Sequence, residues 1–314
     1  VATALADAGC HTFFVATAEE GLALRAALPD VRILVLHGVQ EGEEFAFAAH
    51  RIIPVLNSLE QLARWKPIAD QHPHAVSALH LDTGMGRLGL QQQEFSTLLQ
   101  KNPDALAACR VGLLMSHLAC APEAEHPLNA QQLSAFQAMR ALAPTIPASL
   151  CNSGGIFLGA PYHFNLARPG CSLYGIAPQS AAANPMQPVA TWNAPILQIR
   201  TLEHAQSIGY GATVHAEQGT RIATLASGYA DGYLRHLSNK GSGYIGATRV
   251  PLLGRVTMDM VCFDVSRVPE SALANATHMT LLGDADGDDL ADAAGTIGYE
   301  ILTRIGGRVK REYC

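Results

Sequence analysis

One glycine-rich segment of the sequence carries a cation that could bind a planar anion. It reads H-L-D-T-G-M-G-R-L-G-L over residues 80–90 and contains a single arginine, Arg87. The glycines allow tight backbone turns, and the rigid fork of an arginine suits a carboxylate or a phenolate. The segment therefore indicates an anion-binding loop at the end of a strand, with a solvated surface loop as the alternative.

Two further segments place a titratable side chain at the end of an apolar run. M-S-H-L-A (115–119) contains His117, and N-L-A-R-P-G-C-S-L-Y-G (165–175) contains Arg168. A histidine beside apolar residues is more often a core residue than a catalyst, and Arg168 alone could form a structural salt bridge. Both positions still favour a catalytic site, because active sites of parallel barrels lie at strand ends.

The segment C-N-S-G-G (151–155) has the composition of a phosphate site. Ser153 and the glycines after it occupy a strand-to-helix turn, where backbone N–H groups bind anions. Gly170 and Cys171 form a second such turn after the next apolar run. Barrel enzymes bind phosphate in the loops after their last two strands, so a phosphorylated ligand is expected. A nucleophilic role for Cys151 is the weaker alternative.

Three glycine-bounded motifs follow in the second half of the chain. They read S-I-G-Y-G-A-T (207–213), S-G-Y-A-D-G (227–232) and G-R-V-T-M-D-M (254–260). A tyrosine between glycines usually packs in a turn. Taken singly, these motifs indicate turns and no chemistry.

The elements that must position the first group of residues alternate between strand and helix. Seven apolar runs are expected to be strands: 13–17, 33–37, 51–56, 75–81, 111–117, 148–151 and 164–168. Helical patterns at 18–28, 58–71 and 129–143 lie between them. Such alternation predicts a parallel sheet of the α/β class. A (β/α)8 TIM-like barrel needs eight strands, so we expect one with its first βα unit missing. The helical pattern at the start, ended by Gly9, agrees with a lost N-terminal segment.

A change of pattern near residue 180 predicts a second domain. The stretch 177–188 is rich in proline and alanine, and afterwards five apolar runs are separated by turn residues. We expect a barrel domain over 1–180 and a mostly β domain over 189–314, with one helix at 290–303. The expected strands of the second domain are 191–203, 221–227, 243–250, 251–265 and 278–283.

Composition excludes several classes of protein. The chain of 314 residues has 48% hydrophobic and 15% charged residues and a net charge of -6, with no run of basic residues. A nucleic-acid partner is therefore not expected, and no apolar run is long enough for a membrane span. Seven cysteines without a C-x-x-C pair predict free thiols in the cytoplasm. We expect no metal site.

Taken together, the motifs closely resemble the alanine racemase family. D-T-G-M-G-R-L-G, R-P-G-x-x-L-Y-G, G-Y-G-A, G-Y-A-D-G and G-R-V-T-M-D occur in the order and spacing of that family. The C-terminal G-Y-E-I-L-T-R-I-G-G-R-V-K-R-E-Y matches as well, so the resemblance covers essentially the whole chain. It implies a pyridoxal 5'-phosphate enzyme, an isomerase, with a barrel domain followed by a β domain.

The resemblance also implies a role for each matching residue. Tyr210 matches the catalytic acid–base tyrosine, which reaches into the partner subunit's site, and His117 matches the histidine bonded to it. Arg168 matches the arginine that faces the pyridine nitrogen. The phosphate-binding set is matched by Ser153, Gly170, Cys171 and Tyr299. Substrate contacts are matched by Arg87, Met258, Asp259 and Tyr229, with Met258 also acting across the interface of a homodimer.

The sequence departs from the family pattern at two lysines. Many members carry a carbamylated lysine two residues before D-T-G, where this chain has His80. Neutral imidazole supplies no negative charge, so a bound anion could hold Arg87 in its place. The lysine that binds the cofactor covalently belongs to the first barrel unit in the family. No such segment occurs in this chain, and its four lysines (Lys66, Lys101, Lys240 and Lys310) have other contexts.

The function expected from these residues is interconversion of L- and D-alanine by two-base proton exchange at Cα. It would supply D-alanine for peptidoglycan or allow its catabolism. The chain as written is expected to be inactive without a lysine segment. The alternatives are a non-catalytic pyridoxal-phosphate-binding barrel, an inactive fragment, and a racemase of broader specificity.

Overall fold

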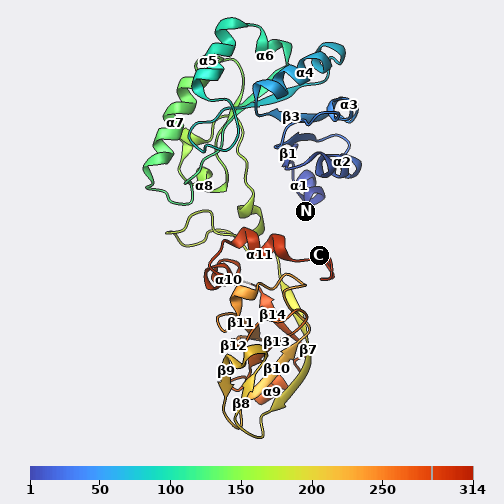
Figure 1. The fold of residues 1–314 in the computed structure, drawn as a ribbon, viewed down its shortest axis with the longest axis vertical. Coiled ribbons are helices and arrows are strands. Elements are labelled where there is room, and N and C mark those ends of the chain that lie inside the picture. Colours follow the sequence, from blue (N-terminus) through green and yellow to red (C-terminus); the bar gives the residue numbers. More distant parts are fainter. Residues whose placement is uncertain (284–285, 314) are drawn as a thin grey trace. The chain divides into compact units, whose positions relative to one another are not determined.

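The computed structural model describes residues 1–283 and 286–313. The chain forms two compact units (Figure 1). One consists of Val1–Gly170 with Gln179–Ala181, and the other of Cys171–Pro178 with Ala182–Cys314. Each unit is described separately below.

The first unit is built on a parallel sheet of six strands in sequence order. The strands are β1 (Thr12–Val15), β2 (Arg32–Val35), β3 (Ile52–Leu56), β4 (Ser77–His80), β5 (Val111–Met115) and β6 (Ala148–Ser149). Every residue of β3 and β4 is buried. Strands buried on both faces are typical of parallel sheets in α/β barrels, which confirms the expected class of the first domain.

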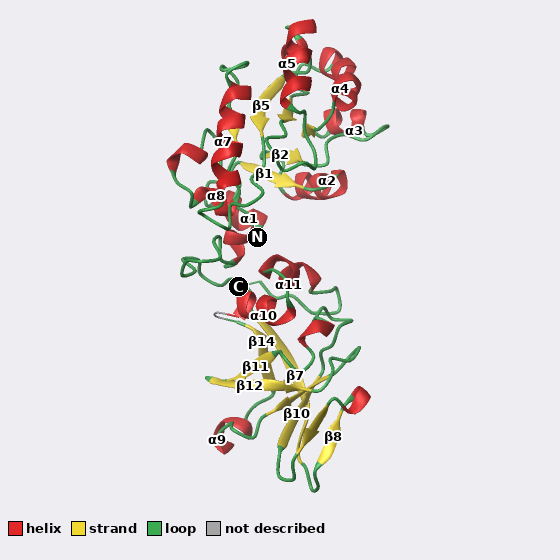
Figure 2. Ribbon diagram, turned by 60° about the vertical axis from the view of Figure 1, so that its left-hand side comes forward, coloured by secondary structure: helices red, strands yellow, loops and turns green. Residues whose placement is uncertain are grey.

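Helices connect these strands and lie outside the sheet, as Figures 1 and 2 show for α4, α5 and α7. The helices are α1 (Ala2–Asp7), α2 (Ala18–Ala27), α3 (Glu44–Ala49), α4 (Leu59–Gln71), α5 (Gln92–Lys101), α6 (Ala105–Ala108), α7 (Pro127–Arg140), α8 (Ser153–Ile156) and the 3-10 turn η1 (Ala160–Tyr162). Local sequence sets their starts. Thr17 caps α2 in a capping box with Glu20, and Ser58 caps α4. Trp65 of α4 and Phe95 of α5 are fully buried in the core.

The expected strand at 164–168 is wrong. Phe164 has a φ of 51°, which belongs to the left-handed region. The side chain of Asn165, in place of a backbone carbonyl, accepts the hydrogen bond from Ala148 N at 2.9 Å. Only one isolated parallel bridge forms, between Asn152 and Arg168. The segment therefore runs beside β6 without forming a regular strand, and its end still brings Arg168 to the carboxyl end of the sheet.

The second unit contains a closed antiparallel barrel with strand order β10-β13-β12-β11-β14-β7, together with the hairpin β8-β9. The strands are β7 (Trp192–Thr201), β8 (Gln206–Ile208), β9 (Val214–Ala216), β10 (Arg221–Leu225), β11 (Ser242–Ile245), β12 (Thr248–Leu253), β13 (Val261–Asp264) and β14 (His278–Leu282). Phe263 and Met279 are fully buried in its core. The expectation of a mostly β second domain is confirmed.

Short helices lie around this barrel, with α10 and α11 side by side (Figures 1 and 2). They are α9 (Glu270–Leu273), α10 (Asp286–Ala294) and α11 (Gly298–Arg304), with the 3-10 turns η2 (Cys171–Tyr174), η3 (Tyr210–Ala212) and η4 (Arg235–Leu237). The single helix expected at 290–303 is wrong, because Gly295 takes a φ of 69° and separates α10 from α11. No helix among the described residues is long and apolar enough to cross a membrane.

The strands expected at 243–250 and 251–265 are also wrong in their bounds. Gly246, with a φ of 56°, turns the chain between β11 and β12, and β12 continues to Leu253. Gly254, with a φ of 78°, then starts the turn that precedes β13. A glycine in the left-handed region turns the chain and ends the strand, although the β-branched residues around it favour strand structure.

Candidate functional site

Arg168 places a cation at the carboxyl end of the parallel sheet. Its guanidinium donates hydrogen bonds to Ser149 Oγ, to Ser116 O at 2.5 Å and to Leu150 O at 3.1 Å. Within the described chain no carboxylate lies within ion-pair distance of it, so the alternative of a structural salt bridge is wrong. Burial lowers the pKa of Arg168 to about 10, and the group therefore stays cationic at neutral pH.

His117 lies beside this arginine, with its Nδ1 atom 3.4 Å from Nη2 of Arg168. Burial and then the charge of Arg168 lower the pKa of His117 to about 3. The ring is neutral at physiological pH. Both ring nitrogens face donors, because Nδ1 faces the guanidinium and Nε2 lies 3.4 Å from the amide nitrogen of Asn152. The neighbourhood therefore holds His117 in its neutral form.

A buried glutamine supports the end of β5 that carries His117. Gln132, from α7, donates to the His117 carbonyl at 2.9 Å and accepts from Ala119 N at 2.9 Å. Its amide nitrogen also reaches Thr83 Oγ1 at 3.3 Å, and Thr83 is bonded to Ser116 at 2.7 Å. The sequence motifs do not predict this network, because a glutamine within a helical pattern gives no indication of which groups it will hydrogen-bond.

The loop that carries Arg87 is folded around Asp82. Oδ1 of Asp82 accepts hydrogen bonds from the backbone N–H groups of Gly84, Met85 and Gly86 at 3.0 to 3.1 Å. Arg87 itself is exposed and makes no hydrogen bond or ion pair with the described residues. Its positive charge nevertheless lowers the pKa of His117. The loop thus offers a free guanidinium near the carboxyl end of the sheet.

His80 is buried and held by Asn57. The His80 Nδ1 and Asn57 Oδ1 atoms lie 2.8 Å apart, and the Asn57 amide donates to Leu36 O and Val55 O. Asn57 Oδ1 must therefore be the acceptor, which places the imidazole proton on Nδ1. Burial lowers the pKa of His80 to about 4. The ring is neutral and supplies no negative charge to Arg87.

Ser153 begins α8 and contacts the turn after Arg168. Its Oγ accepts a hydrogen bond from Gly170 N at 2.8 Å, and Asn152 caps α8 by accepting from Gly155 N at 3.0 Å. Ser153 is 1% exposed. The structure thus joins two of the residues expected to bind phosphate. Burial raises the pKa of the neighbouring Cys151 thiol, which argues against a nucleophilic role.

In the second unit, Cys171 and Tyr299 are also in contact. The backbone N–H of Cys171 donates to the hydroxyl of Tyr299 at 3.3 Å. Tyr299 lies in α11 and is 45% exposed. A hydroxyl bonded to a backbone amide in this way is a polar pair able to bind an anionic oxygen.

Tyr210 presents its side chain to solvent from η3. It is 73% exposed, between Gly209 and Gly211, whose φ angles are 71° and 74°. The guanidinium of Arg255 packs where a side chain on Gly211 would lie. The hydroxyl of Tyr210 makes no hydrogen bond with the residues that the structure describes. Glycines on both sides therefore hold an exposed phenol at the tip of a turn.

Tyr229 and Met258 belong to two loops that dock backbone to backbone. Tyr229 N donates to Thr257 O, and Ala230 N donates to Met258 O, both at 3.0 Å. The N–H groups of Met258 and Asp259 have no hydrogen-bond acceptor in the described chain. Met258 is 54% exposed. The loop therefore presents two free backbone donors and an exposed apolar side chain.

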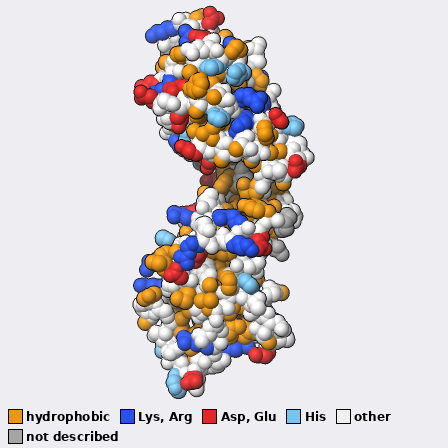
Figure 3. Space-filling view, turned by 90° about the vertical axis from the view of Figure 1, so that its right-hand side faces the viewer, with side chains coloured by type: hydrophobic (Ala, Val, Ile, Leu, Met, Phe, Trp, Pro, Cys, Tyr) orange, Lys and Arg blue, Asp and Glu red, His pale blue; other side chains and the backbone are white. Residues whose placement is uncertain are grey.

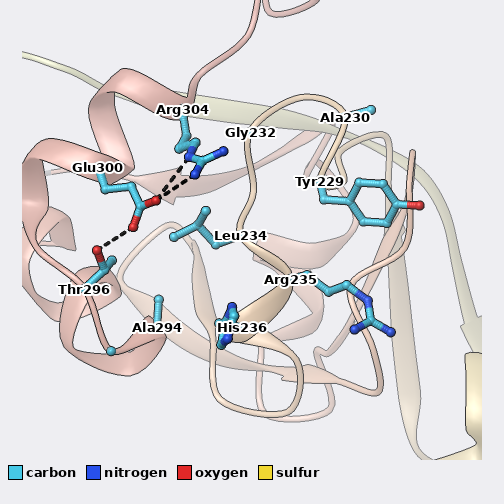
Figure 4. A pocket seen from close by; sticks show the side chains of 11 residues that line it. Tyr229, Ala230, Gly232, Leu234, Arg235, His236, Ala294, Thr296, Glu300 and Arg304 are labelled. Atoms are coloured by element: carbon cyan, nitrogen blue, oxygen red, sulfur yellow. Dashed lines mark hydrogen bonds and ion pairs between the residues drawn. The ribbon is translucent and has the colours of Figure 1, made fainter.

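Tyr229 also lines a pocket of about 680 Å³ in the second unit (Figure 4). Arg235 and His236 of η4 line it, together with Glu300 and Arg304 of α11. Figure 4 shows the Glu300 carboxylate bonded to Arg304 and Thr296, while no bond is drawn to Arg235. Figure 3 shows lysine and arginine side chains gathered on the surface of this unit, with acidic side chains beside them.

Neither lysine of the first unit lies at the carboxyl end of the parallel sheet, and the other two lysines belong to the second unit. Lys66 is exposed on α4, and Lys101 is exposed at the last position of α5. Lys240 is exposed in a turn, and Lys310 is paired with Glu312 at 2.6 Å. The described first unit therefore supplies anion-binding groups near Arg168 and no lysine beside them.

Two family models together match nearly the whole chain. Residues 1–178 match the model described as "Alanine racemase, N-terminal domain", and residues 189–313 match "Alanine racemase, C-terminal domain". The alanine racemase of Rhodospirillum rubrum is 48% identical, over 100% of this chain and 84% of the relative. The protein named "Alanine racemase, catabolic" of Agrobacterium fabrum is 45% identical, over 100% and 81%.

Solved structures agree with these relatives. The alanine racemase of Bartonella henselae with covalently bound pyridoxal phosphate superposes with a TM-score of 0.91 at 36% identity, covering 100% of this chain and 88% of that chain. The biosynthetic alanine racemase of Pseudomonas aeruginosa superposes with a TM-score of 0.90 at 34% identity, covering 100% and 87%. Sequence and fold agree, and the chain belongs to the alanine racemase family.

Proposed function

We propose that this protein is an alanine racemase that interconverts L- and D-alanine with pyridoxal phosphate as its cofactor. The names of its relatives support the reaction, and the pyridoxal phosphate bound covalently to the Bartonella henselae enzyme supports the cofactor. One observation of the site carries the proposal furthest. Arg168 is a cation held by hydroxyl and carbonyl groups without a carboxylate, and it lies beside the neutral His117.

The residues of the first unit fit this cofactor. When bound, pyridoxal phosphate withdraws electrons from Cα of the amino acid and so makes its proton acidic. Ser153 and the backbone of Gly170 would bind the phosphate, and Cys171 and Tyr299 are proposed for the same role. Arg168 would face the ring nitrogen. Because Arg168 stays charged, it disfavours a proton on that nitrogen and restrains side reactions such as transamination.

The covalent attachment of the cofactor is assigned to none of the four lysines. Attachment requires an amine near the carboxyl end of the sheet, whereas Lys66 and Lys101 lie elsewhere in the first unit and Lys240 and Lys310 belong to the second unit. Reduction of the cofactor-loaded 314-residue chain with borohydride should therefore leave Lys66, Lys101, Lys240 and Lys310 unlabelled. Specific labelling of one of them, found by peptide mapping, would assign it the attachment role.

Tyr210 is proposed as the proton-exchange group on one face of Cα, within the active site of a partner subunit. Its hydroxyl is exposed and makes no hydrogen bond in the described chain, as a group that acts outside its own chain requires. The imidazole of His117 in the receiving subunit would bond to it. Active enzyme is then a homodimer, because neither chain alone carries a complete site.

The substrate would be held by groups that have no hydrogen-bond partner among the residues that the structure describes. Arg87 is free to bind the carboxylate of alanine and the phenolate of the cofactor. The free N–H groups of Met258 and Asp259, from the partner subunit, would bind the same carboxylate, with Tyr229 at the entrance to the site. These assignments use every free donor described above.

The test is racemisation by the protein expressed from its natural gene and loaded with pyridoxal phosphate. Chiral chromatography should show D-alanine forming from L-alanine, and Tyr210→Phe should largely abolish conversion in both directions, because inversion from either enantiomer needs both proton-exchange groups. If Tyr210→Phe kept full racemase activity, the role assigned to this tyrosine would be wrong. A protein that binds the cofactor and converts neither enantiomer would be the cofactor-handling alternative.

A further inference from the structure

Arg308, near the C-terminus, joins two carboxylates from distant parts of the second unit. Its Nε atom lies 3.2 Å from Oδ1 of Asp231, and its Nη1 atom lies 2.8 Å from Oδ1 of Asp259. Among the ion pairs of the described residues, no other cation bridges two acids. The sequence motifs gave no role to Arg308 or to Asp231.

Asp231 is the fixed end of this bridge. It is 8% exposed, and its Oδ2 accepts a hydrogen bond from Gly228 N at 2.8 Å. Its backbone carbonyl accepts from Gly306 N at 2.9 Å. A carboxylate this buried needs its partners. Asp231 thus ties the turn 228–232 to the C-terminal segment that carries Arg308.

Asp259 lies on the loop that Arg308 would hold. The loop is short and irregular, and Thr257 Oγ1 closes it by donating to Met260 O at 2.6 Å. Its carbonyl groups accept from Tyr229 N and Ala230 N, so it rests on the same turn that Asp231 anchors. No other charged side chain of the described residues forms an ion pair with Asp259. Arg308 is therefore the ionic link between the turn and the loop.

Electrostatics explains why the bridge matters to the loop. The hydrogen bond to Asp259 and the charge of Asp231 raise the pKa of Arg308, as expected for a shared cation. Without Arg308, two carboxylates would face the same space with no cation between them. Their repulsion would push the loop away from the turn, and the free negative charge would oppose a substrate carboxylate.

We propose that Arg308 is a positioning residue that neutralises Asp231 and Asp259 and holds loop 257–260 against turn 228–232, in the place where the loop binds the substrate's carboxylate. The inference rests on the racemase function and on the substrate role of this loop. Arg308 itself does not touch substrate. It acts through the backbone donors of Met258 and Asp259.

The kinetic test compares Arg308→Gln and Arg308→Lys with a matched control, Arg311→Gln, in the cofactor-loaded natural gene product. Arg311 is an exposed arginine of the same segment, bonded only to the carbonyls of Ile305 and Gly306. Arg308→Gln should raise KM for alanine about tenfold, the scale of a misplaced binding group, with a smaller change in kcat. Arg308→Lys should restore part of the loss, and Arg311→Gln should leave KM unchanged.

Salt separates positioning from a general loss of structure. KM of the unmodified enzyme should rise with ionic strength, because the Arg308–Asp259 arm of the bridge is exposed and therefore screened by salt, while KM of Arg308→Gln should respond less. Equal KM values in Arg308→Gln and the unmodified enzyme would overturn the proposal.

Hydrogen exchange tests the loop independently of the reaction. The amides of Tyr229 and Ala230 donate to the loop carbonyls, so Arg308→Gln should accelerate their exchange about tenfold relative to Arg311→Gln. Unchanged protection would overturn the proposal even in a fully active enzyme. If the unmodified protein does not racemise alanine, only the proposed function is contradicted. The hydrogen-exchange measurement does not depend on the reaction and still tests whether Arg308 holds the loop.

Discussion

The guanidinium of Arg168 lies 3.4 Å from Nδ1 of His117, and this pair sets the charge state of both groups. The arginine keeps its proton with a pKa of about 10, while the histidine loses its own with a pKa of about 3. A fixed cation beside a fixed neutral base leaves no mobile proton between them. The proton that moves in the proposed reaction must then belong to another group, and Tyr210 is the one assigned.

Arg168→Lys should reduce kcat about 100-fold, the scale of a lost preorganised donor set. A lysine keeps the charge and loses the planar fork that reaches Ser149, Ser116 and Leu150 together. Steady-state kinetics with L-alanine measures the loss. Arg110→Lys, the same change at an exposed arginine away from the site, should leave kcat within twofold. Equal kcat in both variants would show that the fork is not needed.

His80 should make stability depend on pH. Its folded pKa of about 4 lies below the unfolded value of about 6.5, so the unfolded chain binds more protons between these values. The stabilisation from the neutral ring is complete above pH 6.5 and is lost as the pH falls toward 4. The slope in this window should be about 1.4 kcal/mol per pH unit from His80.

The free energy of unfolding in urea at pH 7, 5.5 and 4.5 measures this slope. His80→Gln should flatten it, because the glutamine amide can still donate to Asn57 without titrating. His204→Gln, at an exposed histidine, should leave the slope as it is. Identical slopes in His80→Gln and the unmodified protein would contradict the neutral buried ring.

Gly228→Ala should displace the loop that carries Met258. A Cβ at this position would overlap the carbonyl groups of Thr257 and Met258, so we expect a loss of about 1–3 kcal/mol in the free energy of unfolding. KM for alanine should rise with it. Gly307→Ala is the matched control, since its Cβ meets no atom within 4 Å. An unchanged KM in Gly228→Ala would show that this loop does not take part in substrate binding.

Mixing two inactive variants should restore activity if Tyr210 acts across the dimer. A mixed dimer of Tyr210→Phe and Arg168→Lys subunits contains one site with both residues intact. Random mixing should give about a quarter of the unmodified activity. If Tyr210 served its own chain, every site would carry one defect and no activity would return.

Sequence pattern predicted the fold in its main lines. The alternation of apolar and helical runs, read with the glycine motifs, predicted the parallel sheet, and it found Arg168 and His117 at its carboxyl end. Expectations failed where a single backbone angle outweighed the pattern. Gly295 divides the helix expected at 290–303, and the left-handed Phe164 prevents a regular strand at 164–168.

The supporting residues of the site could not be predicted in the same way. Asn57 meets His80 across 23 positions, and Gln132 meets His117 across 15. Arg308 meets Asp259 across 49. Such contacts arise from how the elements pack, and a buried amide or a surface arginine has no periodic signal of its partner. Sequence therefore indicated which residues carry the chemistry, while the structure was needed to find what holds them.

Deuterium incorporation at Cα of alanine in D2O tests the proposed racemisation most directly. Enantiopure L-alanine is incubated with the cofactor-loaded product of the natural gene, and NMR and chiral chromatography follow the label and the two enantiomers. L- and D-alanine should reach equal amounts, and both should carry deuterium at Cα. Alanine that stays in the L form with its Cα proton, while pyridoxal phosphate is bound, would contradict the proposed racemisation.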